Sequence, residues 1–134
     1  MKLLAFDTSS QALSVALTED DNLLGKIDLN IKKNHSLTLM PAIDFLMTHV
    51  GIKPEELDRI AVAQGPGSYT GLRIAVTTAK TLASTLNIDL VGVSSLVAIA
   101  TNVDVVGKVV PLIDARRQNV YAGIYENGLS IGQE

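Results

Sequence analysis

A glycine- and proline-rich segment in the middle of the chain constrains its fold more than any other feature. This segment, residues 64–73 with the sequence QGPGSYTGLR, follows an apolar run at 60–63 and precedes a long stretch of small and apolar residues at 74–86. That order predicts a strand, a tight turn and the start of a helix. Since helix N-termini present unpaired N–H groups and a partial positive charge, we expect either an anion-binding turn or the descendant of one.

Composition indicates a globular domain and excludes several kinds of site. The chain is 47% hydrophobic and 19% charged, has a net charge of −3 and contains no cysteine. Disulfides and zinc–thiolate sites are therefore excluded, and no apolar run is long enough to cross a bilayer. The basic pairs Lys32-Lys33 and Arg116-Arg117 are expected to be solvated surface, because tight nucleic-acid binding needs a larger basic face. We expect a soluble cytoplasmic protein.

Hydrophobic periodicity predicts strands joined first by short turns and then by helices. Three apolar or alternating runs with short turns between them indicate an antiparallel meander. A change to helical spacing follows, with Pro41 inside the helix, Gly51 at its end and Ser68 as the cap of the next long helix. The predicted elements are strands at 3–6, 12–17, 23–31, 59–63 and 89–93 and helices at 36–50, 54–57, 69–86 and 96–100.

This order of elements predicts an α/β domain of the ribonuclease-H-like (actin-like ATPase) type, with a mixed five-stranded sheet and helical crossovers. We expect residues 1–103 to form it and 104–107 to be a linker. Residues 108–134 are expected to begin a second domain of the same type, with strands at 109–114 and 119–125 and a turn at 126–128. Because so few strands cannot bury both faces, we expect this second domain to be truncated.

Few residues offer catalytic chemistry. Asp7-Thr8-Ser9 ends the first strand, where a carboxylate and hydroxyls can hold a phosphate or its metal, or can simply bond their own backbone in a turn. The only histidines, His35 and His49, would lie about 20 Å apart on one straight helix and cannot share a metal there. The helix at 69–86 carries small and hydroxyl side chains, which favour either a close partner contact or an ordinary solvated face.

Motifs spread over nearly the whole chain resemble those of the bacterial TsaB (YeaZ) family, in order and at the family's spacing. Together they are more specific than any single glycine motif, and they imply a two-domain actin-like fold. The matching residues are Leu4-Ala5-Phe6-Asp7-Thr8-Ser9, Asn34-His35-Ser36 with Leu39-Met40-Pro41, Gly65-Pro66-Gly67-Ser68-Tyr69-Thr70-Gly71-Leu72-Arg73, Ala79-Lys80, Gly92-Val93-Ser94-Ser95-Leu96, and Asp114-Ala115-Arg116-Arg117 with Val120-Tyr121.

The resemblance implies a scaffold rather than an enzyme. The family is a paralogue of TsaD, the catalytic subunit that makes threonylcarbamoyladenosine (t6A) in tRNAs reading A-starting codons, and TsaD-like proteins carry two metal-binding histidines. Aligned on Gly92-Val93, these histidines fall at Ser95 and Ile99, where isoleucine offers no ligand atom and serine only a weak one. We therefore expect a non-catalytic activator of TsaD, without a metal or cofactor of its own, in which Asp7, Thr8 and Ser9 form a vestigial nucleotide loop.

The resemblance also implies the partners. TsaD is expected to bind through the helices at 36–50 and 69–86 in a four-helix contact, and the ATPase TsaE to join the assembly. Without TsaD, two copies of the chain are expected to pair. ATP is expected only at a composite site, tRNA only indirectly, and a membrane not at all. The residues expected at the partner interface are Leu39, Met40, Ile43, Met47, Tyr69, Gly71, Arg73, Ile74, Thr77, Thr78 and Thr81.

Two other functions stay open on the residues alone. A nucleotide-dependent ATPase or kinase of the actin-like superfamily would use Asp7-Thr8-Ser9 and the glycine turn. A peptidase of the M22 type is the remote alternative, since the sequence offers neither a metal site nor a nucleophile–base pair.

Overall fold

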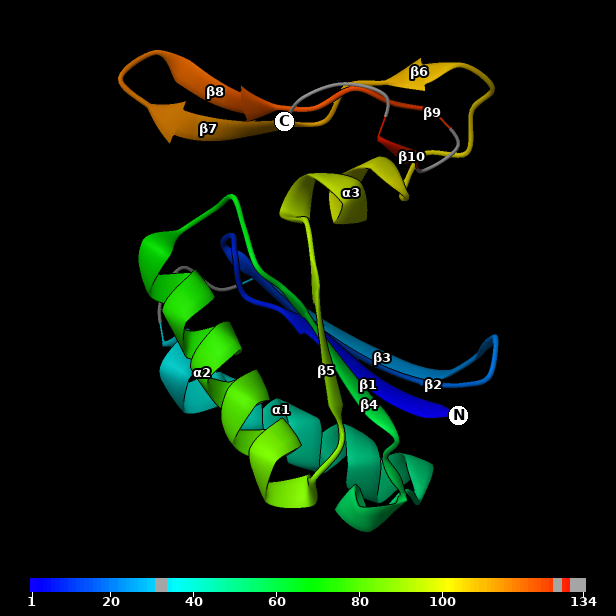
Figure 1. The fold of residues 1–134 in the computed structure, drawn as a ribbon. Coiled ribbons are helices and arrows are strands. Elements are labelled where there is room, and N and C mark those ends of the chain that lie inside the picture. The colour runs from blue at the N-terminus through cyan, green and yellow to red at the C-terminus, as the bar shows by residue number, and fades with distance from the viewer. Residues whose placement is uncertain (31–33, 127–128, 131–134) are drawn as a thin grey trace.

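The computed structural model describes residues 1–30, 34–126 and 129–130 (Figure 1). Its main sheet has five strands in the order β3-β2-β1-β4-β5. Some predicted features lie outside the described residues. They are Ile31 at the expected end of the third strand, the Lys32-Lys33 pair, and most of the turn expected at 126–128. The strands of the main sheet are β1 Lys2–Asp7, β2 Ala12–Glu19, β3 Asn22–Asn30, β4 Arg59–Ala63 and β5 Asp89–Val93.

The pairing of these strands confirms the predicted mixed sheet. β1, β2 and β3 form an antiparallel meander, whereas β4 lies parallel to both β1 and β5. Parallel neighbours need a crossover connection, and the helices α1 (His35–Val50) and α2 (Tyr69–Leu86) provide it. The carboxyl ends of β1, β4 and β5 therefore meet at one edge of the sheet.

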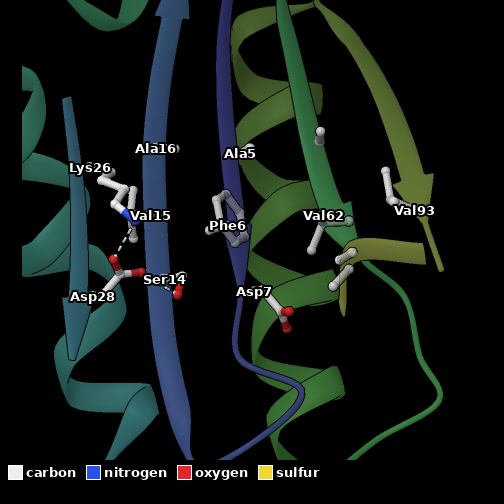
Figure 2. A pocket seen from close by; sticks show the side chains of 13 residues that line it. Ala5, Phe6, Asp7, Ser14, Val15, Ala16, Lys26, Asp28, Val62 and Val93 are labelled. Carbon is white, nitrogen blue, oxygen red and sulfur yellow. Dashed lines mark hydrogen bonds and ion pairs between the residues drawn. The ribbon is translucent and has the colours of Figure 1, made fainter. Parts of the chain in front are cut away.

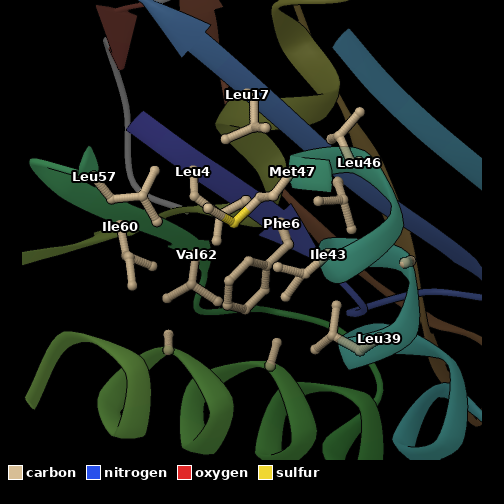
Figure 3. Packing of buried hydrophobic residues seen from close by; sticks show 14 of the residues in the cluster. Leu4, Phe6, Leu17, Leu39, Ile43, Leu46, Met47, Leu57, Ile60 and Val62 are labelled. Carbon is tan, nitrogen blue, oxygen red and sulfur yellow. The ribbon is translucent and has the colours of Figure 1, made fainter. Parts of the chain in front are cut away.

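Both long helices pack on the same face of the sheet, and the main core lies between them and the strands (Figures 1 and 3). Alternate strand residues such as Leu4, Phe6, Ile60 and Val62 point into this core. α1 continues through Pro41, which is exposed, and ends at Gly51 with φ +86°. Each crossover helix thus buries one apolar stripe against the sheet and leaves its other side on the surface.

The region after β5 is built from short elements. The described ones are α3 Ser95–Ala100, β6 Lys108–Val109, β7 Leu112–Arg116, β8 Asn119–Ala122, β9 Tyr125–Glu126 and β10 Leu129–Ser130. β6, β9 and β10 form one small sheet, and β7 and β8 form a separate hairpin. Leu96, Ala100 and Tyr125 make a second, smaller core.

Two strand predictions in this region are wrong in detail. The strand expected at 109–114 is divided between β6 and β7, with the buried Pro111 between them. The strand expected at 119–125 is divided by Gly123, where an added Cβ would lie 2.6 Å from the Tyr125 ring. The β7–β8 turn is also unusual, because Arg116, Arg117 and Gln118 all have positive φ. The domain boundary near residue 108 stays a prediction.

No helix in the described part of the chain is both long and apolar enough to cross a membrane.

Removing a core side chain should cost far more stability than removing a surface one. Ile60 is fully buried between the sheet and the helices, whereas Leu23 on β3 is 58% exposed. Ile60→Ala is expected to lower the free energy of unfolding by about 2–5 kcal/mol, because it leaves a cavity, and Leu23→Ala by less than about 1 kcal/mol. Urea denaturation of both variants measures the difference, and equal losses would contradict this placement of the core.

Candidate functional site

Three loops meet where β1, β4 and β5 end. They are the loop after β1, the glycine-rich loop before α2 and the short connection from β5 to α3. Ligands of open α/β sheets bind at the carboxyl ends of the strands, so this loop cluster is the first candidate site.

The loops bond mainly to one another. The Ser68 N–H donates to the Ser9 carbonyl at 2.7 Å, and the Ser95 N–H donates to the Gly65 carbonyl at 2.8 Å. The hydroxyl of Thr8 donates to the Gly71 carbonyl at 2.6 Å. The backbone N–H groups of Ser68 and Ser95 are thus bonded within the chain rather than offered to a ligand.

The glycines of the turn are required by this packing. A Cβ added to Gly67 would lie 2.5 Å from the carbonyl oxygen of Ser9, and one added to Gly71 would overlap the carbonyl oxygen of Thr8. Gly71 is buried in the first turn of α2, whose cap is the predicted Ser68. The expectation that Gly71 contacts a partner is therefore wrong, because Gly71 is buried and the backbone of Thr8 fills the space where its side chain would lie.

Asp7, Thr8 and Ser9 form a bonded turn. An Asp7 carboxylate oxygen accepts the Ser9 N–H at 2.7 Å, which is the local turn that the sequence left as one of two alternatives. Thr8 is fully buried and Ser9 nearly so. A vestigial nucleotide loop here stays a prediction.

The two positions at which the resemblance places metal-binding histidines have different surroundings. Ser95 is buried, and its hydroxyl donates to the Ser9 hydroxyl at 3.2 Å. Ile99 is 40% exposed on α3. The histidines that the chain does have lie elsewhere: His35 Nε2 bonds the Ser10 carbonyl, and His49 stacks on Phe45 with ring centroids 4.0 Å apart.

The sheet face opposite α1 and α2 carries a shallow hollow of about 240 Å³ (Figure 2). Its floor is formed largely by alanines, including Ala5 and Ala16, which leave room above the strands. At its rim Asp28 accepts the Ser14 hydroxyl at 2.7 Å and pairs with Lys26 at 2.9 Å. The Ser14 hydroxyl, and then Lys26, hold the pKa of Asp28 below its ordinary value. The floor offers contact area rather than reactive groups.

The outward side of α1 and α2 is the second candidate. Tyr69 is 75% exposed at the start of α2, and the Arg73 guanidinium lies 5.7 Å from the centre of its ring. Met40 on α1 is also exposed. Between the two helices lies a groove of about 400 Å³, lined by Ser36, Thr70, Arg73, Ile74, Thr77 and Thr78. We call this surface the α1–α2 face.

The structure divides the predicted interface residues into two groups. Leu39, Ile43 and Met47 are buried in the main core, so their prediction as partner contacts is wrong. The helical stripe that identified them is the stripe that packs on the sheet. The others, apart from Gly71, lie on or beside the α1–α2 face, with Ile74 and Thr78 half-buried.

Sequence reasoning missed two residues on this side. Leu37 of α1 is 72% exposed, and Lys80 of α2 is exposed seven residues after Arg73. Both had a signal in the sequence. Leu37 is a large apolar residue off the core stripe, and a spacing of seven places two side chains on the same side of a helix.

Comparisons with known proteins agree on one family. Residues 22–132 match the family model described as TsaD: tRNA N6-adenosine threonylcarbamoyltransferase. The chain is 46% identical over 134 residues to the tRNA threonylcarbamoyladenosine biosynthesis protein TsaB of Bacillus subtilis (strain 168), a match covering 96% of this chain and 58% of that protein. It is 33% identical over 140 residues to the protein of the same name from Escherichia coli (strain K12), covering all of this chain and 60% of that protein.

A solved structure shares the fold. The chain matches YeaZ from Pseudomonas aeruginosa with a TM-score of 0.89 and 33% identity, covering 99% of this chain and 64% of that one. The chain thus spans less than two thirds of the length of each of these proteins.

Substituting Gly71 should destabilise the fold because the methyl group has no space. We expect Gly71→Ala to lower the free energy of unfolding by about 1–3 kcal/mol or more, since the start of α2 or the loop after β1 must move. Ser84→Ala on the exposed side of the same helix is the control and should change stability by less than about 0.5 kcal/mol. Thermal or urea denaturation compares the two. A Gly71→Ala variant as stable as the control would show that the loops do not pack this closely.

Proposed function

Because the chain belongs to the TsaD family, and within it to the TsaB (YeaZ) branch, we propose that it acts in the biosynthesis of threonylcarbamoyladenosine in tRNA. Its role is that of a non-catalytic scaffold that stabilises and activates TsaD. The tRNAs concerned are those that read A-starting codons, and the chain reaches them only through TsaD, in the cytoplasm.

The observation that carries this proposal is the α1–α2 face. Large side chains such as Leu37 and Tyr69 are mostly exposed on it, next to a groove. Exposed apolar groups gathered on one side of a soluble domain are typical of a protein interface. Two helices from each partner would then pack in a four-helix contact. TsaE would join the assembly through TsaD, and two copies of the chain would pair when TsaD is absent.

The loop cluster supports the non-catalytic part of the proposal. Where the paralogue is expected to carry metal-binding histidines, this chain has Ser95, bonded to Ser9, and Ile99. A hydroxyl engaged with another hydroxyl is a poor ligand, and an isoleucine is none. We propose that the transfer chemistry belongs to TsaD and that ATP, where it binds, does so at a site shared with a partner.

Reconstitution tests the scaffold role directly. TsaD and TsaE would be assayed for t6A formation with and without this protein, and we expect modification to depend on its addition. Unchanged modification in its absence would refute the scaffold.

A charge placed on the α1–α2 face tests where TsaD binds. Thr77 is exposed on α2, so Thr77→Glu should leave the fold intact and weaken co-purification with TsaD by at least about tenfold, because a carboxylate would be buried in the contact. Asn102→Glu puts the same charge on an exposed turn after α3 and should co-purify normally. If a folded Thr77→Glu protein still binds TsaD fully, the contact lies elsewhere.

A further inference from the structure

The outward side of α2 is cationic, although the chain as a whole is acidic. The chain has a net charge of −3. α2 itself contains Arg73 and Lys80 but no aspartate or glutamate, and both cations are exposed. Among the ion pairs of the described residues, none involves Arg73 or Lys80. Two positive charges on one side of the helix therefore have no carboxylate partner among the residues that the structure describes.

The groove beside these cations offers hydrogen-bond donors and no negative group. Its lining combines the Arg73 guanidinium with the hydroxyls of Ser36, Thr70 and Thr77. A guanidinium presents several N–H donors in a planar fork that fits a carboxylate in two bonds. A groove of about 400 Å³ has room for the end of an aspartate or glutamate side chain.

The Arg73 side chain lies beside the ring of Tyr69. The guanidinium lies 5.7 Å from the ring centre, within the range of a cation–π contact. Such a contact limits the conformations of a long side chain, which reduces the entropy lost when it binds. Arg73 therefore lies at the edge of the groove with a contact that favours one placement of its guanidinium.

We propose that the α1–α2 face selects a partner that carries carboxylates, with one aspartate or glutamate seated on Arg73 in the groove and a second near Lys80. This inference rests on the proposed function and names the chemistry that the partner must present. Where TsaD is present, the occupant is TsaD, and the pairing of two copies is the weaker alternative. In a two-fold contact between copies through α2, Arg73 and Lys80 of one copy would lie near the same cations of the other, and like charges repel. The described α1 offers only one acid, Asp44, to pair with them.

Charge reversal with a partner-side rescue tests this proposal. The chain and its cognate TsaD are co-expressed, and their affinity is measured by calorimetry at about 50 and about 500 mM NaCl. We expect Arg73→Glu to weaken binding by at least about tenfold, and the wild-type affinity to fall with salt more steeply than that of Arg73→Gln. Reversing carboxylates on TsaD to lysine, one at a time, should restore binding of Arg73→Glu at one position.

Matched variants separate charge from folding. Lys108→Glu reverses an exposed cation on β6 and should bind as wild type. Tyr69→Phe keeps the aromatic ring beside Arg73 and should bind nearly normally, whereas Tyr69→Leu should weaken binding. Circular dichroism verifies that each variant is folded.

Each result has a definite meaning. If Arg73→Glu and Lys80→Glu bind TsaD as wild type while Thr77→Glu does not, the carboxylate proposal is overturned and the scaffold role stands. If the wild-type chain does not bind TsaD, both fail. If Arg73→Glu changes only self-association, measured by sedimentation, the occupant is a second copy and the choice of partner made here is wrong.

Discussion

The direction in which α2 leaves the sheet depends on one close contact, that between Gly71 and the backbone of Thr8. The Thr8 hydroxyl donates to the Gly71 carbonyl, and the missing Cβ of Gly71 lets the helix start lie directly on the loop after β1. Ser68 and Ser95 add backbone bonds from the neighbouring loops. With that end fixed, α2 lies beside α1 on the sheet, and Tyr69, Arg73 and Lys80 come to share its outer side. The proposed partner surface is therefore a consequence of how three loops pack.

Sequence periodicity was enough for the main domain and failed after it. The meander, both crossovers and the Ser68 cap follow from apolar spacing and local turn chemistry, which act within a few residues. The elements after α3 are shorter, and their limits depend on particular contacts, such as that between Gly123 and the Tyr125 ring. The spacing of residues in the sequence does not predict such a contact, because the contact depends on how side chains and backbone pack in three dimensions.

The same limit explains the errors in the candidate site. The sequence predicts the apolar stripe of α1 at a partner surface, but this stripe packs against the sheet, as the burial of Leu39 and Ile43 shows. Periodicity identifies that a helix has an apolar side without saying what covers it. The glycine turn was anticipated as an anion-binding turn or its descendant. Only the three-dimensional arrangement reveals that Ser9 and Thr8 occupy the space beside its glycines.

The β7–β8 hairpin gives the molecule an uneven distribution of local stability. Its turn places three successive non-glycine residues, Arg116, Arg117 and Gln118, at φ values of 65°, 53° and 62°, a conformation that costs L-residues about 1–2 kcal/mol each. The hairpin is paired with no other strand in the described chain, and most of its residues are exposed. A two-stranded ribbon of this kind opens at a far lower free energy than a packed sheet. Thermal motion should therefore open this hairpin many times for each opening of the main sheet, so that the α1–α2 face stays rigid while the β7–β8 hairpin fluctuates.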